Sequence, residues 1–227
     1  KKVAYFNLEM NKKHIGQRII ANASELELAR IVNAKTFLGN EQEQFNKAIS
    51  DIRELNLSVI TGSLSDLDIT AECRFQEYDL VVIDYLQLIR CTKRVGSRRE
   101  EVGAVSRKIK EMAMDLNVAV LLLSQLSRKS EYTQDKEPTM ADLRETGDIE
   151  QDATNIILMW NLSDNDDYRA FKGLKVDKNR QGELMSECLE FDGKHMRFLE
   201  CPKSLSEVKS LVDNNSDVDV SGNCPFD

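Results

Sequence analysis

The chain has 227 residues, of which 41% are hydrophobic, with only ten glycines and three prolines. This length fits one large or two small domains, and the apolar content is enough to build a packed core. No run of about eighteen apolar residues occurs, and the start at Lys1 shows no signal-peptide pattern, so we expect neither a membrane span nor a secretory leader.

The five cysteines are scattered without a C-x-x-C pair, and His14 and His195 lie far apart in the sequence. This spacing argues against a disulfide framework or a structural zinc site and favours a reducing, cytoplasmic environment. The net charge of −8 by itself weighs against a nucleic-acid partner. However, acidic residues concentrate in residues 204–227 while residues 90–110 are basic, so an acidic protein can still present a locally basic surface.

Strand-like apolar runs alternate with amphipathic stretches in the first half of the chain. Strands are expected at residues 3–8, 57–60, 80–83 and 118–123, and helices at residues 12–23 and 41–55. The clearest helix follows Ser97, which predicts a capping box with Glu100, because apolar residues then recur at steps of three and four. This alternation predicts βαβ units, so the expected fold class is α/β with a mostly parallel sheet.

The second half of the chain begins with polar and charged residues at 128–138 and 142–152, which predict a long surface loop region. Strands are then expected at residues 154–160, 174–178, 186–191 and 196–199, the last ones as a hairpin or meander at the sheet edge. Beyond Pro202 the composition predicts at most a helical turn before flexible chain. We therefore expect a folded domain at residues 1–203 and an acidic, flexible tail at residues 204–227.

Three of the expected buried strands run into polar side chains, which are Glu9, Asp84 and the pair Ser124 and Gln125. Because the carboxyl ends of parallel strands meet at one edge, where α/β proteins bind ligands, these groups should converge. Two carboxylates and an amide suit phosphoryl chemistry, in which one acid holds Mg²⁺, another polarises water and the amide orients the terminal phosphate. Each residue alone has an ordinary explanation, since Glu9 could simply open the next helix.

Four segments resemble successive motifs of the DnaB-type replicative DNA helicases, in the same order and with similar spacing. They are FNLEM at residues 6–10, VIDYLQL at 82–88, LSQLSR at 123–128 and DLRETGDIEQDA at 142–153. The resemblance extends over residues 3–200, and the last segment is far more specific than a strand followed by an acid.

The resemblance implies a RecA-like P-loop NTPase core, with a mostly parallel sheet flanked by helices and extra carboxy-terminal strands. It also implies the motor domain of an ATP-dependent replicative DNA helicase, which couples ATP hydrolysis to translocation on single-stranded DNA and to duplex unwinding. ATP and Mg²⁺ are the implied cofactors. The implied partners are single-stranded DNA, further copies in a homo-hexamer, a helicase loader and a primase, with no membrane involved.

Position by position, the resemblance assigns catalytic roles to Glu9, Gln125, Lys178 and Arg180. Glu9 resembles the glutamate that activates water, and Gln125 resembles the glutamine that reads the γ-phosphate. Lys178 and Arg180 resemble the K-x-R element that reaches a neighbouring subunit's nucleotide, with Arg180 as the arginine finger. Asp84 resembles the Walker B aspartate of the Mg²⁺ site. Without the resemblance, an ordinary turn arginine would explain Arg180 equally well.

The same resemblance implies a DNA-binding role for Arg144, Glu145 and Gly147, in a loop that follows single-stranded DNA. An arginine can bind phosphate, and a glycine lets a backbone N–H approach phosphate closely, which gives sequence-independent contact. A loop acid such as Glu145 would otherwise be expected only to form an ion pair. The basic residues at 90–110 are open to two interpretations, a channel-facing element or a solvated helix face.

The chief departure from the family pattern is that the phosphate-binding motif G-x-x-x-x-G-K-[ST] does not occur. In the family this loop precedes the strand represented by residues 3–8, so we expect the chain to be a fragment that lacks the first strand and the P-loop. On that expectation the piece alone binds nucleotide weakly or not at all. A smaller departure is Gln-Gly-Glu at residues 181–183, where the family usually has asparagine, glycine and proline.

Two other functions stay open at the level of sequence. The chain could be a non-catalytic module that binds single-stranded DNA or mediates assembly, and the missing phosphate-binding motif favours that alternative for the isolated piece. It could also be a metal nuclease that uses Glu9 and Asp84, although such a site normally has further carboxylates or a histidine at the same edge.

Overall fold

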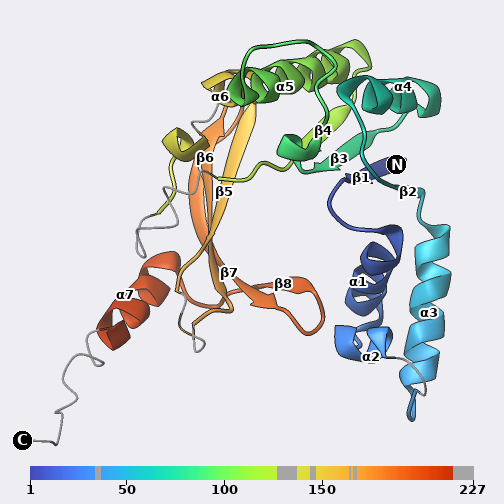
Figure 1. The fold of residues 1–227 in the computed structure, drawn as a ribbon. Helices are drawn as coiled ribbons and strands as arrows, with labels where there is room; N and C mark the ends of the chain where they lie inside the picture. The colour runs from blue at the N-terminus through green and yellow to red at the C-terminus, as the bar shows by residue number, and fades with distance from the viewer. Residues whose placement is uncertain (34–36, 127–136, 144–146, 164, 166–167, 217–227) are drawn as a thin grey trace, which may run out of the picture. The chain divides into compact units, whose positions relative to one another are not determined.

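The computed structural model describes the chain except for residues 34–36, 127–136, 144–146, 164, 166–167 and 217–227, which Figure 1 draws as a thin grey trace. The chain divides into two compact units. The first comprises Lys1–Ser127, Ala141–Thr154 and Lys194–Met196, and the second comprises Arg128–Met140, Asn155–Gly193 and Arg197–Asp227. Within the described residues, no helix is long and apolar enough to cross a membrane.

A parallel sheet organises the first unit. Its strands are β1 (Val3–Asn7), β2 (Leu57–Thr61), β3 (Leu80–Asp84) and β4 (Ala119–Leu122), arranged in the order β2-β1-β3-β4. All neighbouring pairs are parallel, and β1 and β3 are in register so that Asn7 lies opposite Asp84. The prediction of an α/β fold with a parallel sheet is therefore confirmed.

Several helices of the first unit begin at polar residues whose side chains cap them. The helices of this unit are α1 (Lys12–Ser24), α2 (Leu28–Val32), α3 (Glu41–Glu54), α4 (Asp66–Gln76), α5 (Arg98–Asp115) and α6 (Gly147–Asp152). Asn11 caps α1 by accepting a hydrogen bond from the backbone N–H of His14. Ser65 and Asp68 form a complete capping box at α4, a helix that apolar periodicity did not predict.

The capping box predicted for α5 is only half formed. The Ser97 hydroxyl accepts a hydrogen bond from the backbone N–H of Glu100, as expected. The Glu100 carboxylate instead accepts from the backbone N–H of Gly96 at 2.9 Å, and not from Ser97. Because the preceding turn places Gly96 within reach, the hydrogen bond to the Glu100 carboxylate comes from Gly96 and not from Ser97, one residue further along the chain.

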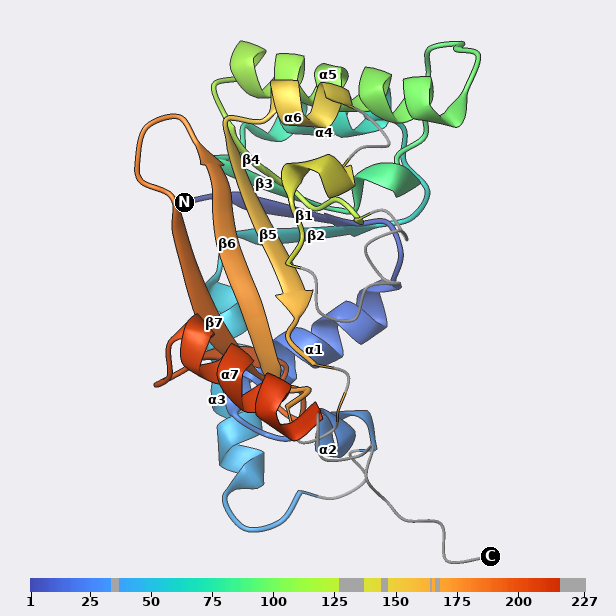
Figure 2. The same cartoon turned by 90° about the vertical axis from the view of Figure 1, so that its left-hand side faces the viewer.

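One face of the parallel sheet packs against α4 and α5, which lie over it in Figure 2. Alternate side chains of β1 and β3 are fully buried there, as the twofold periodicity of a strand requires. Leu86, in the short 3-10 helix η1 (Leu86–Leu88), joins the same core. The buried residues from the strands and the two helices include Ala4, Phe6, Val81, Ile83, Ile69, Val105, Ile109 and Met112.

A second, smaller cluster joins α1, α2 and α3, which Figure 1 shows side by side. Ala21, Leu26 and Ile31 form its buried part. Phe37 and Phe45 pack at its border with their ring centroids 4.8 Å apart.

The region predicted as a surface loop at residues 142–152 contains regular structure, so that prediction is wrong in part. A 3-10 helix, η3 (Met140–Leu143), and then α6 occupy most of it. The charged sequence of α6 gave little periodic signal because the helix is only six residues long and gains its stability from packing on α5.

The second unit contains an antiparallel sheet with the strand order β5-β6-β7-β8. The strands are β5 (Asn155–Asn161), β6 (Phe171–Asn179), β7 (Met185–Asp192) and β8 (Arg197–Glu200). They lie where the sequence predicts strands, but they form a sheet of their own. Helix α7 (Leu205–Ser216) occupies the start of the segment predicted as a flexible tail, and its Val208 and Val212 are buried.

Trp160 on β5 packs over Gly173 on β6, which lies directly opposite it in the antiparallel register. A side chain at residue 173 would overlap the indole ring. The ring is also contacted by the ammonium group of Lys209 from α7, 5.7 Å from its centroid.

An ionic cluster ties three segments of the second unit together. The Glu137 carboxylate forms ion pairs with the ammonium groups of Lys209, at 2.6 Å, and Lys175, at 3.2 Å. Lys175 also pairs with Asp177, whose other oxygen accepts from the backbone N–H of Met140. The hydrogen bond from Lys209, followed by that from Lys175, holds the pKa of Glu137 below its ordinary value although partial burial opposes this.

Gly173→Ala should destabilise the second unit by about 1–3 kcal/mol, because the new methyl group must displace the Trp160 ring. Trp160 is the single tryptophan of the chain, so its fluorescence during urea unfolding reports on this packing directly. Gly16→Ala is the matched control: nothing lies within 4 Å of a side chain there, and alanine in a helix should stabilise by about 0.5–1 kcal/mol. Equal effects of the two changes would contradict the packing argument.

Glu137→Gln should lower the free energy of unfolding by about 0.5–1 kcal/mol at neutral pH. Since the folded-state pKa of Glu137 is lowered, its stabilisation is complete above the unfolded-state pKa of about 4.3 and is lost as the pH falls through the folded-state value. Urea unfolding of parent and variant, followed from about pH 7 to about pH 2, measures the difference. A difference that stays constant over this range would exclude the carboxylate charge as its source.

Candidate functional site

The carboxyl ends of β1, β3 and β4 lie on one edge of the parallel sheet, here called the carboxyl edge. Backbone hydrogen bonds continue past the strand ends, from Leu8 N–H to the Asp84 carbonyl at 2.8 Å and from Leu86 N–H to the Leu123 carbonyl at 2.9 Å. Glu9 comes directly after Leu8, and Gln125 follows shortly after Leu123. The structure therefore brings Glu9, Asp84 and Gln125 to the same edge, as the strand pattern predicts.

Asp84 is the last residue of β3, and its carboxylate is held on one side. Its Oδ2 accepts hydrogen bonds from the side-chain amide of Asn7 at 2.7 Å and from the hydroxyl of Tyr5 at 2.9 Å. Burial raises the pKa of the Tyr5 hydroxyl; the hydrogen bond with Asn7 lowers it, and the bond with Asp84 raises it. Oδ1 of Asp84 makes no hydrogen bond with any residue that the structure describes, so it remains available to a ligand.

Glu9 lies in the bend between β1 and α1, and its side chain is exposed. The bend is fixed by the backbone N–H of Met10, which donates to Oδ1 of Asn7 at 2.6 Å. Asn11, and not Glu9, caps the following helix. The carboxylate of Glu9 forms no ion pair or hydrogen bond within the described part of the chain, so the structure offers no capping role for it.

Gln125 is held through its backbone and exposes its side chain. The side chain of Gln87 donates to the Ser124 hydroxyl at 3.1 Å and to the Gln125 carbonyl at 3.2 Å, and it accepts from the Gln125 N–H at 3.2 Å. The guanidinium of Arg98 donates in turn to the Gln87 carbonyl. Sequence reasoning did not single out Gln87, although it lies inside the VIDYLQL segment.

Lys178 and Arg180 belong to the second unit. Lys178 lies on β6 opposite Ile156, and Arg180 follows in the turn between β6 and β7, with its side chain exposed. The side chain of Asn179 closes this turn, since it accepts from the N–H of Gln181 and donates to the carbonyl of Glu183. The structure thus groups Lys178 with Arg180, in a different unit from the residues of the carboxyl edge.

Of the predicted DNA-binding residues, Arg144 and Glu145 lie outside the described residues, and Gly147 is the first residue of α6. Helix α6 is fastened to α5 at both of its ends. The Ser106 hydroxyl donates to Asp152 at 2.8 Å, and the Arg107 guanidinium pairs with Asp148 at 3.3 Å.

Basic residues between positions 90 and 110 are in part neutralised by neighbouring acids. Arg90 pairs with Asp68, and Arg98 pairs with Glu101. Lys108 pairs with an acid one helical turn along α5. This pairing favours the interpretation of a solvated helix face over that of a nucleic-acid contact.

The donor set at the carboxyl edge fits a Mg²⁺ ion bound together with phosphate. The described parts of the chain contain no cluster of three or more histidine, cysteine, aspartate or glutamate residues that could hold a metal ion. Mg²⁺ in phosphoryl-transfer sites needs only one or two carboxylates, because substrate phosphates and water complete its coordination. Asp84 satisfies this requirement through the oxygen that Asn7 and Tyr5 leave available.

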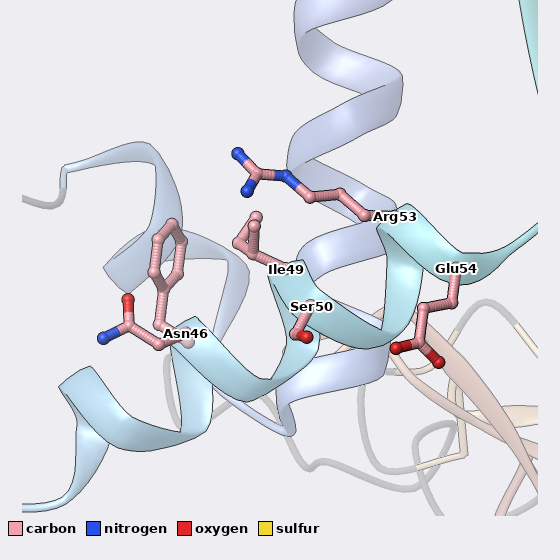
Figure 3. Close-up of a pocket in the computed structure, with 6 residues that line it drawn as sticks. Asn46, Ile49, Ser50, Arg53 and Glu54 are labelled. Atoms are coloured by element: carbon pink, nitrogen blue, oxygen red, sulfur yellow. The ribbon is translucent and has the colours of Figure 1, made fainter.

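A hollow of about 510 Å³ on α3 does not resemble a binding site for such a ligand. It is lined by Phe45, Asn46, Ile49, Ser50, Arg53 and Glu54, all from one helix. Figure 3 shows that Arg53 and Glu54 point to different sides rather than toward a common centre. Helix α3 ends just before the amino end of β2, which lies at the opposite edge of the sheet from the carboxyl edge.

Known proteins similar to this chain include replicative DNA helicases. The chain is similar to a probable plasmid replicative DNA helicase of Chlamydia psittaci (35% identity, 85% of this chain, 43% of the relative) and to replicative DNA helicase DnaB of Buchnera aphidicola (32% identity, 87% and 44%). Among solved structures it resembles an ATPase domain (TM-score 0.81, 31% identity, 88% and 75%). It equally resembles a DnaB-like replicative helicase studied for its interactions with primase (TM-score 0.81, 30% identity, 88% and 51%).

The parallel sheet, its carboxyl edge and these structural neighbours define the class as a RecA-like helicase ATPase domain. Residues 1–200 match the DnaB-like helicase C terminal domain, and the chain belongs to that family. It spans less than half the length of the two curated relatives.

Gln87→Ala should loosen the backbone that carries Gln125, because the N–H of Gln125 donates to the Gln87 side chain. The loss of one hydrogen bond of about 1 kcal/mol corresponds to about fivefold faster amide exchange at Gln125. Hydrogen exchange followed by NMR measures this rate. Gln76→Ala is the control, since that side chain contacts Lys2 on another part of the unit. An amide exchange rate at Gln125 that stays at the parental value in Gln87→Ala would show that Gln87 does not hold the Gln125 backbone.

Proposed function

We propose that the chain is the motor part of a replicative DNA helicase, in which ATP hydrolysis at the carboxyl edge drives translocation on single-stranded DNA and duplex unwinding. The supporting observation is that Glu9, Asp84 and Gln125 emerge from adjacent parallel strands at one edge, in a member of this helicase family. Phosphoryl transfer requires little covalent chemistry from a protein, so the positions of these groups are what matters.

In this proposal the exposed carboxylate of Glu9 accepts a proton from the attacking water and orients it toward the γ-phosphate. The Oδ1 atom of Asp84 would hold Mg²⁺, which when bound neutralises phosphate charge. The Gln125 amide contacts the γ-phosphate, while Gln87 keeps the Gln125 backbone in place. Glu9 suits a general base because its carboxylate is not engaged by any described residue.

Lys178 and Arg180 act in this scheme on the nucleotide of an adjacent copy of the protein. A guanidinium at the γ-phosphate stabilises charge that develops in the transition state, and such a group is worth about 10³–10⁵ in rate. The exposed position of Arg180 in a turn closed by Asn179 is compatible with insertion into another subunit. The proposed assembly is therefore a homo-hexamer whose sites are completed between subunits.

Arg144, Glu145 and Gly147 are proposed to line the path of single-stranded DNA. Gly147 begins α6, and hydrogen bonds or ion pairs of Ser106 and Arg107 hold this helix on α5. Since the Glu145 side chain is negatively charged, as DNA phosphate is, its contribution would come from the backbone N–H. Primase is a proposed partner because one structural neighbour was studied with primase, and a helicase loader is proposed on the family resemblance.

Glu9→Gln in the product of the complete open reading frame that encodes these 227 residues should lower kcat for ATP hydrolysis by about 10²–10⁴-fold. ATP binding should remain near the parental affinity, because the amide keeps the shape of the side chain. Steady-state ATPase assays with and without single-stranded DNA, together with nucleotide titration, measure both quantities. Glu43→Gln, at an exposed carboxylate on α3, is the matched control and should behave as the parent.

The same assays separate the competing functions. Single-stranded DNA binding without any ATP turnover in the parent protein would replace the motor with a binding or assembly module. Mg²⁺-dependent DNA cleavage without ATP, lost in Glu9→Gln, would replace it with a nuclease. Equal turnover in Glu9→Gln and parent would remove Glu9 from the mechanism.

A further inference from the structure

We propose that Asn7 is the positioning residue of the carboxyl edge, which holds the Asp84 carboxylate and the bend that carries Glu9 in a fixed relation to each other. This inference rests on the proposed function for its consequence, but its structural part is independent of it. Asn7 touches neither water nor substrate in the proposed reaction, and it acts through the two acids.

The first observation is the burial of a polar side chain with every hydrogen-bonding group engaged. Asn7 is 1% exposed at the end of β1. Its amide nitrogen donates to Asp84 at 2.7 Å and to the Tyr5 hydroxyl at 2.9 Å, and its Oδ1 accepts from the N–H of Met10 at 2.6 Å. A buried amide without partners costs about 1–3 kcal/mol, so the partners are needed for folding as well.

The second observation is that these partners are the two parts of the candidate site. The donor end of the amide reaches across to the neighbouring strand β3, where it contacts the candidate Mg²⁺ ligand. The acceptor end reaches forward to the residue after Glu9. A single rigid planar group therefore links two acids that lie far apart in the sequence.

The orientation of Asp84 follows directly. Its Oδ2 is occupied by donors from Asn7 and Tyr5, so the plane of the carboxylate is set and Oδ1 is the oxygen left for a cation. Mg²⁺ demands nearly ideal octahedral geometry. Mutation of a residue that orients a metal ligand therefore typically weakens metal binding by about 10–100-fold.

The chemistry of asparagine is specific to this task. Aspartate at position 7 would keep an acceptor for Met10 but would place a second negative charge against Asp84 and lose the donor. Leucine has a similar volume but neither a donor nor an acceptor. Tyr5→Phe removes one donor to Asp84 and leaves the Asn7 contacts with Asp84 and Met10 in place.

The test uses the product of the complete open reading frame with Mn²⁺ as the probe and a non-hydrolysable ATP analogue. Electron paramagnetic resonance of free Mn²⁺ should show about 10–100-fold weaker binding in Asn7→Leu and Asn7→Asp, and a smaller loss in Tyr5→Phe. Asn46→Leu, at an exposed asparagine on α3, is the control and should bind Mn²⁺ as the parent does. Parental Mn²⁺ affinity in Asn7→Leu overturns the proposal.

A second readout does not depend on nucleotide chemistry. Amide exchange at Met10 should be about fivefold faster in Asn7→Leu and unchanged in Tyr5→Phe, because Asn7 is the residue that accepts from that N–H. Asn7→Asp keeps this acceptor, so it should separate the loss of Mn²⁺ affinity from the loss of order at Met10. Unchanged exchange at Met10 in Asn7→Leu overturns the link to Glu9.

These measurements distinguish failure of this inference from failure of the motor proposal. If the parent protein binds no Mn²⁺ with nucleotide, the motor proposal falls. The positioning role is then decided by the amide exchange at Met10 and by a double-mutant cycle of Asn7→Leu with Asp84→Ala in urea unfolding. A coupling free energy of zero between the two changes would overturn the positioning role.

Discussion

Parallel pairing of β1 with β3 places Asn7 opposite Asp84, and the rest of the carboxyl edge depends on this register. Because side chains alternate across a sheet, a shift of β1 by one residue would turn Asn7 to the face that α4 and α5 cover and away from Asp84. It would also bring Ala4 and Phe6 out of the core. The hydrophobic core and the candidate site are thus specified by the same pairing, so the packing that stabilises the first unit also aligns its polar edge.

A second principle is that exposed functional side chains are held by less exposed neighbours. The side chains of Glu9 and Gln125 are exposed, while Asn7 holds the N–H of Met10 beside Glu9 and Gln87 holds the N–H of Gln125. Asp84 is held directly by Asn7 and Tyr5. In the proposed reaction such an arrangement would reduce the reorganisation needed on phosphate binding, because the supporting hydrogen bonds are already formed. The polar residues behind the edge are therefore as relevant to the proposed reaction as the acids themselves.

The second unit is stabilised by a different set of contacts. Its antiparallel strands need little connecting chain, and a tryptophan over a glycine together with a shared carboxylate locks β5, β6 and α7 together. Composition concealed this order, since α7 lies in a segment rich in acids, serine and asparagine. Val208 and Val212, four residues apart, were the available signal for an amphipathic helix, and their burial shows that two well-placed apolar residues outweigh the polar average.

The amino-acid sequence by itself determined the strand positions, the parallel character of the first sheet and the convergence of Glu9, Asp84 and Gln125. It could do so because runs of apolar residues that end in polar groups follow local periodicity. It did not reveal α4 or α6, whose periodic signal is weak, nor the separate antiparallel sheet, because strand partners are chosen by contacts between distant residues. Only the tertiary structure decided that Asn7 joins Asp84 to the bend of Glu9, and that Gln87 supports Gln125. The hydrogen bonds from Asn7 to Asp84 and between Gln87 and Gln125 join segments brought together by folding, and no local pattern of residues encodes them.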